Sequence, residues 1–152
     1  MQAKIAIITG SKSDLKALEA GFDLLKKHKI AYSLDVISAH RNPAKLTKFC
    51  QGLEKKGVKV VIGCAGMAAA LPGFVASLVD IPVIGVAMKG GIMDGLDALF
   101  AVVSSPKGLG LSSTGIGKSA FINAVIVALE IIGIADKAYK NKAIKIKDSF
   151  RK

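Results

Sequence analysis

Short apolar runs alternate along the chain with segments whose apolar residues recur every three or four positions. The runs predict buried strands at 4–10, 31–37, 58–66 and 82–87, and a weaker strand at 109–114. The periodic segments predict helices at 13–28, 43–53, 67–79, 94–103 and 118–133. Because strands and helices alternate throughout, we expect an α/β fold in which a parallel sheet carries helices on both faces.

Length and composition favour a single globular domain over residues 1–152. Of the 152 residues, 51% are apolar, yet no apolar stretch has the length of a membrane span. The first strand begins almost at residue 1, so we expect no signal peptide. Cys50 and Cys64 have no metal-binding spacing and favour the reducing cytoplasm.

The charge favours anionic partners. Lys and Arg number 22 against 11 Asp and Glu, a formal net charge of +11. Part of this charge lies in a basic C-terminal helix or tail from about residue 136, which we interpret as a solvated surface. The tail lacks interleaved aromatic residues for stacking on bases, so nucleic acid is a less favoured partner than a phosphorylated small molecule.

The residues after the predicted strands are candidates for chemistry, since ligands bind at the carboxyl ends of parallel strands. After the first strand, "TGSKSD" offers the hydroxyls of Ser11 and Ser13 and backbone amides at a helix start, which suit an anion. Asp14 is able to hold ribose hydroxyls, or alternatively it is a helix-cap or first-turn acid. After the second strand, "SAHR" offers Arg41 for phosphate and His40 for proton transfer near neutral pH.

Two further segments are weaker candidates for ligand binding. The loop "CAGMAAALPG" (64–73) is small and apolar, so a flat base is able to approach its backbone closely, although it could also be a packing loop. "TGIGKS" (114–119) lacks the first glycine of a phosphate-binding loop, and we interpret it as a loop and a helix start. Cys64 is expected to be a small buried hydrophobe rather than a nucleophile.

The loops taken together resemble one family. "GSKSD", "SAHR" followed by Pro43, "AG-x-AA-x-LPG", "PVIGV" and "GLDAL" occur in the order and spacing of the N5-carboxyaminoimidazole ribonucleotide mutases and the related aminoimidazole ribonucleotide carboxylases. The resemblance covers residues 4–133. It implies a three-layer α/β/α sandwich with a flavodoxin-like sheet, no metal and no organic cofactor. It also implies a homo-octamer, or a smaller homo-oligomer as in some carboxylases, that acts on a ribonucleotide.

The resemblance also implies a role for each candidate residue. Ser11, Ser13 and Arg41 would hold the phosphate, and Asp14 the ribose hydroxyls. His40 would be the general acid and base for moving a carboxylate from N5 to ring C4 through a trapped CO2. The base and carboxyl pocket would be lined by Ser38, Ala65, Gly66 and Leu71.

Several departures keep other functions open. Ala70 stands where mutases commonly have histidine, while Arg41, Ala68, Ala69 and Pro72 are mutase-like, so an aminoimidazole ribonucleotide carboxylase is the alternative. Ser104 and Ser105 replace a usual Gln-Met, and segment 104–120 is expected to form the far wall of the pocket. A non-catalytic nucleotide-binding paralogue is a further alternative. Flavin-based electron transfer is disfavoured because only 5% of the residues are aromatic.

Overall fold

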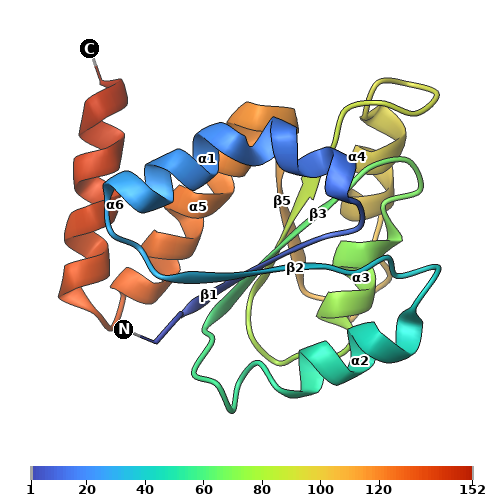
Figure 1. Ribbon diagram of the computed structural model, residues 1–152, viewed down its shortest axis with the longest axis horizontal. Helices are drawn as coiled ribbons and strands as arrows, with labels where there is room; N and C mark the ends of the chain where they lie inside the picture. The colour runs from blue at the N-terminus through green and yellow to red at the C-terminus, as the bar shows by residue number, and fades with distance from the viewer. Residues whose placement is uncertain (1, 152) are drawn as a thin grey trace.

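A five-stranded parallel sheet forms the centre of the computed structural model, which describes residues 2–151 (Figure 1). The strand order is β2-β1-β3-β4-β5, the order of flavodoxin-like folds, which confirms the expected fold class. Every neighbouring pair is parallel. The strands are β1 (Ile5–Thr9), β2 (Tyr32–Val36), β3 (Val60–Ala65), β4 (Val83–Ala87) and β5 (Leu111–Ile116).

Helices cover both faces of this sheet and make it the middle of three layers (Figure 1). One face packs against α1 (Leu15–Lys27), α5 (Gly117–Gly133) and α6 (Lys137–Phe150). The other face packs against α2 (Pro43–Gln51), α3 (Ala70–Ala76) and α4 (Leu96–Val103). A short 3-10 helix, η1 (Lys12–Asp14), joins β1 to α1.

Burial on both faces explains why the strands are continuous apolar runs. In β1, Ile5 and Ile7 belong to the core under α1 and α5, whereas Ala6 and Ile8 belong to the core under α2 and α3. All of these side chains are fully buried. Each fully buried isoleucine contributes about 1.5–3 kcal/mol relative to an exposed one, so a polar residue at any of these positions would be costly.

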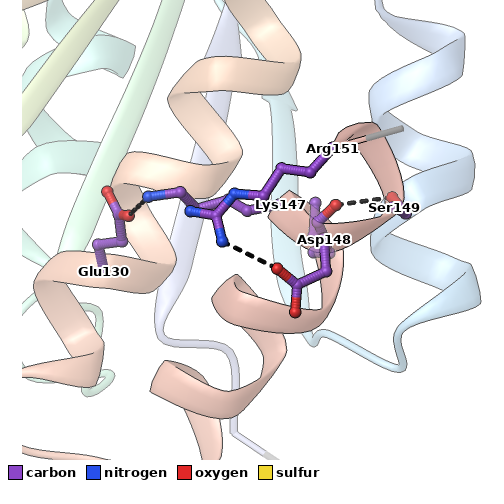
Figure 2. Close-up of polar contacts among 6 residues, drawn as sticks. Glu130, Lys147, Asp148, Ser149 and Arg151 are labelled. Carbon is purple, nitrogen blue, oxygen red and sulfur yellow. Dashed lines mark hydrogen bonds and ion pairs between the residues drawn. The ribbon is translucent and has the colours of Figure 1, made fainter.

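The basic C-terminal segment is a packed helix. Tyr139, Ala143 and Ile146 of α6 are buried, a spacing that places them on one face of the helix, and they join the core that contains α5. On the neighbouring surface, Lys147 of α6 reaches Glu130 of α5 at 2.7 Å, as Figure 2 shows. The remaining lysines of α6 are largely directed to solvent, as expected for a solvated face.

The element boundaries differ from the sequence prediction by at most three residues. The helix expected at 67–79 begins only at Ala70, because Met67 and Ala69 adopt left-handed backbone angles with φ of 54° and 38°. The weak strand expected at 109–114 lies at Leu111–Ile116. Within residues 2–151, no helix has both the length and the apolar character needed to cross a membrane.

Candidate active site

A cleft of about 480 Å³ opens at the carboxyl ends of the central strands. Strands β2, β1, β3 and β4 are consecutive in the sheet, so the loops that follow them meet at one edge. All nine residues proposed for the site from the sequence line this cleft: Ser11, Ser13, Asp14, Ser38, His40, Arg41, Ala65, Gly66 and Leu71.

The loop after β1 presents two hydroxyls and a helix start to the cleft. Ser11 is the N-cap of η1, and its Oγ accepts a hydrogen bond from the backbone N–H of Ser13 at 3.2 Å. The two serine Oγ atoms are 2.8 Å apart. Both side chains are exposed, so this pair of hydroxyls is available to an anionic group.

Asp14 follows in the same loop and is oriented by a buried residue. The hydroxyl of Thr9, which is completely buried at the end of β1, donates to Asp14 Oδ2 at 2.9 Å. Although Asp14 occupies the N-cap position of α1, its side chain makes no capping hydrogen bond. The carboxylate therefore does not cap α1, although it does stand in the first turn of η1.

The loop after β2 forms a tight turn that projects His40 and Arg41. The Ser38 carbonyl accepts from the Asn42 N–H at 3.0 Å, and Ser38 Oγ accepts from the Arg41 N–H at 3.3 Å. Asn42 caps α2 through Lys45 N–H, and Pro43 stands in its first turn, as the sequence indicated. His40 and Arg41 are both exposed at the wall of the cleft.

The loop after β3 provides a wall of small residues. Residues 65–70 all line the cleft. The N–H of Ala69 donates to the carbonyl of Gly66 at 3.0 Å, which closes a tight turn before α3. Met67 projects from this turn with 69% of its surface exposed, so it stands at the rim of the cleft.

The loop after β4 adds a cation that the sequence reading did not identify. Lys89 and Gly91 line the cleft together with the predicted residues. Lys89 Nζ lies 3.8 Å from Asp94 Oδ2, and both side chains are largely exposed. No motif marks Lys89, but it follows the strand next to β3, so the rule that identified the other loops applies to it as well.

Segment 104–120 does not form the far wall of the cleft, contrary to expectation. None of its residues lines the cleft. Ser104 Oγ donates to the Phe100 carbonyl and Ser105 Oγ to the Val102 carbonyl, so these two serines satisfy the last carbonyls of α4. The "TGIGKS" stretch begins α5, as predicted, but its first three residues end β5 instead of forming a loop.

Neither cysteine is suited to nucleophilic chemistry. Cys64 is fully buried at the end of β3, and burial raises its thiol pKa strongly, with the nearby Asp14 charge adding to the effect. Burial raises the pKa of Cys50 to about 11. In the part of the chain that the structure describes, no three His, Cys, Asp or Glu side chains come together in a group able to hold a metal ion.

Comparison with known proteins identifies relatives along nearly the whole chain. The family described as AIR carboxylase matches residues 4–152, and thus extends beyond residue 133 to include α6. N5-carboxyaminoimidazole ribonucleotide mutase of Haemophilus influenzae is 38% identical over 136 residues, which cover 90% of this chain and 83% of the relative.

A yeast protein and a solved structure also match this chain. Phosphoribosylaminoimidazole carboxylase of Saccharomyces cerevisiae is 37% identical over 138 residues; they cover 91% of this chain but only 24% of that longer protein. The crystal structure of PurE from Treponema denticola superimposes with a TM-score of 0.83 at 24% identity, covering 97% of this chain and 90% of that one. This structural likeness supports the fold.

Proposed function

The chain belongs to the AIR carboxylase family, and we propose that it is an N5-carboxyaminoimidazole ribonucleotide mutase. The enzyme is an isomerase of purine biosynthesis that moves a carboxylate from the exocyclic nitrogen of the substrate to carbon 4 of the imidazole ring. The observation that carries the proposal is the convergence of a histidine, an arginine, a serine pair and an aspartate on one cleft with a small-residue wall.

The polar loops orient the substrate. The phosphate lies against the hydroxyls of Ser11 and Ser13 and the guanidinium of Arg41, because these groups donate hydrogen bonds to an anion. Asp14, held by Thr9, accepts hydrogen bonds from the ribose hydroxyls. The imidazole then lies over the backbone of Ala65 and Gly66, where no bulky side chain obstructs a flat ring.

His40 moves the protons. Its imidazolium donates a proton to the exocyclic nitrogen as the bond to the carboxyl carbon breaks, releasing CO2 within the cleft. Ring carbon 4 then attacks the CO2, and neutral His40 removes the proton from that carbon. One group does both, so a side chain that titrates near neutrality serves best.

The small-residue wall contributes by holding the CO2. A cavity lined by Ala65, Gly66, Leu71 and Ser38 leaves room for a small neutral molecule beside the ring. Holding CO2 against carbon 4 turns a bimolecular encounter into a step within one complex. Water excluded from the same volume is unable to hydrate the CO2 before it reacts.

A direct carboxylase is the alternative. The yeast relative is named a carboxylase, and Ala70 in this chain stands where mutases commonly have histidine. Ala70 lines the cleft, so this difference lies at the site itself. An aminoimidazole ribonucleotide carboxylase would use the same cleft but would take CO2 from solution.

We also propose that the chain forms one mutase-like domain that works as a homo-oligomer, an octamer. Leu96, Phe100 and Val103 form an exposed apolar stripe along α4, at 41%, 58% and 58% exposure. Such a stripe is typical of a surface covered by another copy of the chain. Two free buried cysteines support a reducing, cytoplasmic location.

A paired assay tests the function. Purified protein receives N5-carboxyaminoimidazole ribonucleotide in one cell, and aminoimidazole ribonucleotide with bicarbonate in another, each against a blank without enzyme. We expect rapid formation of the 4-carboxylated product from the first substrate only. Product only from the second would make the protein a carboxylase. Absence of product in both, with ligand binding retained, would indicate a non-catalytic nucleotide-binding protein.

A further inference from the structure

The loop between β4 and α4 is a small Ω-loop beside the cleft. It spans residues 88–95 and projects outward at the start of α4 (Figure 1). Its two ends lie against each other, since a Cβ built at Gly95 would be 3.0 Å from the Met88 carbonyl oxygen and 3.5 Å from Lys89 Cα. A loop with such a narrow neck is able to move as a unit, because only the backbone of the neck must change its angles.

The neck of this loop is fixed to the wall of the cleft and to the start of α5. The Met88 N–H donates to the Ala65 carbonyl at 2.9 Å, and a Cβ built at Gly66 would lie 3.5 Å from Met88 Cβ. The aliphatic stem of Lys89 lies along Gly117, where a built Cβ would be 3.5 Å from Lys89 Cγ. The loop therefore starts directly on the wall that holds CO2 in the proposed mechanism.

The tip of the loop, residues 90–94, is apolar and exposed. Ile92 is 97% exposed and Met93 is 52% exposed. The Gly90 N–H donates to Asp94 Oδ1 at 3.2 Å, and the Met93 carbonyl accepts from the first residue of α4 at 3.2 Å. Apart from these bonds within the loop and to α4, the described chain gives the tip no hydrogen bond. The tip is therefore free to move without breaking contacts to the sheet.

An unpaired hydrogen-bond acceptor lies against this tip. Asp97 Oδ1, in the first turn of α4, is buried and has no hydrogen-bond partner within residues 2–151. The carboxylate contacts the loop, since a Cβ built at Gly91 would be 2.7 Å from Asp97 Oδ2. Leaving a buried acceptor unpaired is unfavourable, so a second arrangement of the loop that turns a backbone N–H toward Oδ1 gains a hydrogen bond.

The edge of the cleft beside the loop is exposed and partly apolar. Gly91 and Met67 both line the cleft, and both are exposed, Met67 to 69%. Movement of the tip over the cleft would bury the side chains of Ile92, Met93 and Met67 together. The hydrophobic effect favours this burial.

We propose that loop 88–95 closes over the occupied cleft, and that Ile92 and Met93 keep the CO2 inside until ring carbon 4 has reacted. The inference rests on the proposed function and adds the residues that decide the fate of the CO2. When the carbon–nitrogen bond breaks, the exocyclic nitrogen gains a proton and CO2 is set free. The CO2 then either bonds to carbon 4, which loses its proton, or leaves the cleft, and its departure leaves aminoimidazole ribonucleotide.

Isotope retention measures this partition. N5-carboxyaminoimidazole ribonucleotide labelled with carbon-13 in its carboxyl group is converted in excess unlabelled bicarbonate with carbonic anhydrase, against a blank without enzyme. Mass spectrometry gives the label in the 4-carboxylated product, and chromatography gives the aminoimidazole ribonucleotide released. Wild type should retain nearly all of the label. Ile92→Ser should raise the ratio of released aminoimidazole ribonucleotide to product by roughly tenfold, the factor by which losing the burial of one isoleucine shifts the closed-to-open ratio.

Ile134→Ser is the matched control, because Ile134 is 87% exposed at the end of α5 and does not line the cleft. This control and Ile92→Leu should both retain the label as wild type does. The proposal is overturned if Ile92→Ser releases no more aminoimidazole ribonucleotide than wild type, or no more than Ile134→Ser. A lower oligomeric mass of Ile92→Ser in light scattering would also overturn it, since the tip would then be a contact between copies of the chain.

Thiol labelling follows the closing without turnover. Met93→Cys is treated with a maleimide with and without 4-carboxyaminoimidazole ribonucleotide, while the native Cys50 and Cys64 are buried. The ligand should slow the labelling of Met93→Cys several-fold and leave that of Ile134→Cys unchanged. Equal rates at Met93→Cys, with ligand binding shown by calorimetry, would overturn the closing of the loop. If wild type fails the paired assay yet the ligand still slows labelling, only the proposed function is refuted; if the ligand does not bind, both are.

Discussion

At the scale of single residues, a buried hydroxyl organises the polar end of the cleft. Thr9 is the only buried polar residue among those that the structure describes. Its Oγ1 lies 2.9 Å from Asp14 Oδ2 and 3.3 Å from the Ser11 carbonyl oxygen. Because one hydrogen bond at the end of β1 fixes the direction of Asp14, the carboxylate is positioned before any ligand arrives.

Asp14→Ala should weaken binding of aminoimidazole ribonucleotide by roughly 1.5–3 kcal/mol, the range for a hydrogen bond to a charged group. Calorimetry gives the dissociation constant directly. Glu19→Ala, on the exposed face of α1, is the control for loss of one negative charge. A dissociation constant that is the same for Asp14→Ala and wild type would show that Asp14 does not contact the ligand.

His40→Asn should abolish turnover and leave nucleotide binding measurable. Asparagine keeps a polar side chain in the turn after β2 but is unable to take up and release a proton near neutral pH. The mutase assay and a binding titration on the same preparation separate the two effects. Retention of most of the activity would refute the assignment of the proton transfer to His40.

At the scale of secondary structure, an ion pair at the start of α6 connects this helix to the segment before β1. Asp136 is the N-cap of α6 and accepts from the Ala138 N–H at 3.0 Å. The same side chain lies 2.7 Å from Lys4 Nζ, in the segment before β1. The hydrogen bond from Lys4 lowers the pKa of Asp136, and the bond from Ala138 adds to the effect.

The lowered pKa of Asp136 predicts that the folded protein loses stability as the pH falls. A carboxyl group whose pKa is lower in the folded state than in the unfolded state stabilises the folded state. This stabilisation is complete at pH values above the unfolded pKa, near 4, and is lost as the pH falls through the folded pKa. Asp136→Asn retains the cap and loses the ion pair. The melting temperature of this variant should lie below that of wild type at pH 7, and the gap should close by about pH 2. A gap that stays constant with pH would refute the role of the charge.

The element boundaries show which parts of the fold can be predicted from the sequence. Strands β1, β3 and β4 are buried on both faces, so their residues are almost all apolar and the runs are easily recognised. β5 contains Ser112, Ser113 and Thr114 and is only partly buried, so its signal is weak. The start of α3 could not be predicted, because Met67 and Ala69 adopt backbone angles that usually indicate glycine.

The residues that line the cleft likewise divide into those that can be identified from the sequence and those that cannot. Ser11, Asp14, His40 and Arg41 could be identified because polar residues directly follow recognisable strands whose ends converge. Lys89 also follows such a strand, but one lysine among 22 basic residues has no local signal of its own. Its significance depends on strand order and on the packing of its stem against Gly117, which only the structure reveals.

At the scale of the whole molecule, the exposed surface of α4 is apolar, whereas that of α6 carries lysines beside the exposed Ile144 and Phe150. The apolar stripe of Leu96, Phe100 and Val103 runs along α4, on the opposite side of the sheet from α6. Most lysines of α6 are directed away from the core. Like charges repel, so copies of the chain are expected to meet through α4 rather than through α6.

Phe100→Glu should therefore lower the oligomeric mass measured by light scattering during size-exclusion chromatography. A buried carboxylate in an apolar interface without a partner is strongly unfavourable. Phe150→Glu is a close control, because Phe150 is 59% exposed against 58% for Phe100 but lies on α6. Equal masses for both variants and wild type would show that α4 is not an interface.

The burial of both cysteines has a practical consequence for following this enzyme in solution. Cys50 and Cys64 stay protonated at neutral pH and are shielded from reagents, since burial raises the pKa of each thiol. The native thiols should therefore not react with maleimides. A fluorophore attached to a cysteine introduced at Met67, on the rim of the cleft, would report the arrival and departure of ligand in real time without any native thiol being replaced.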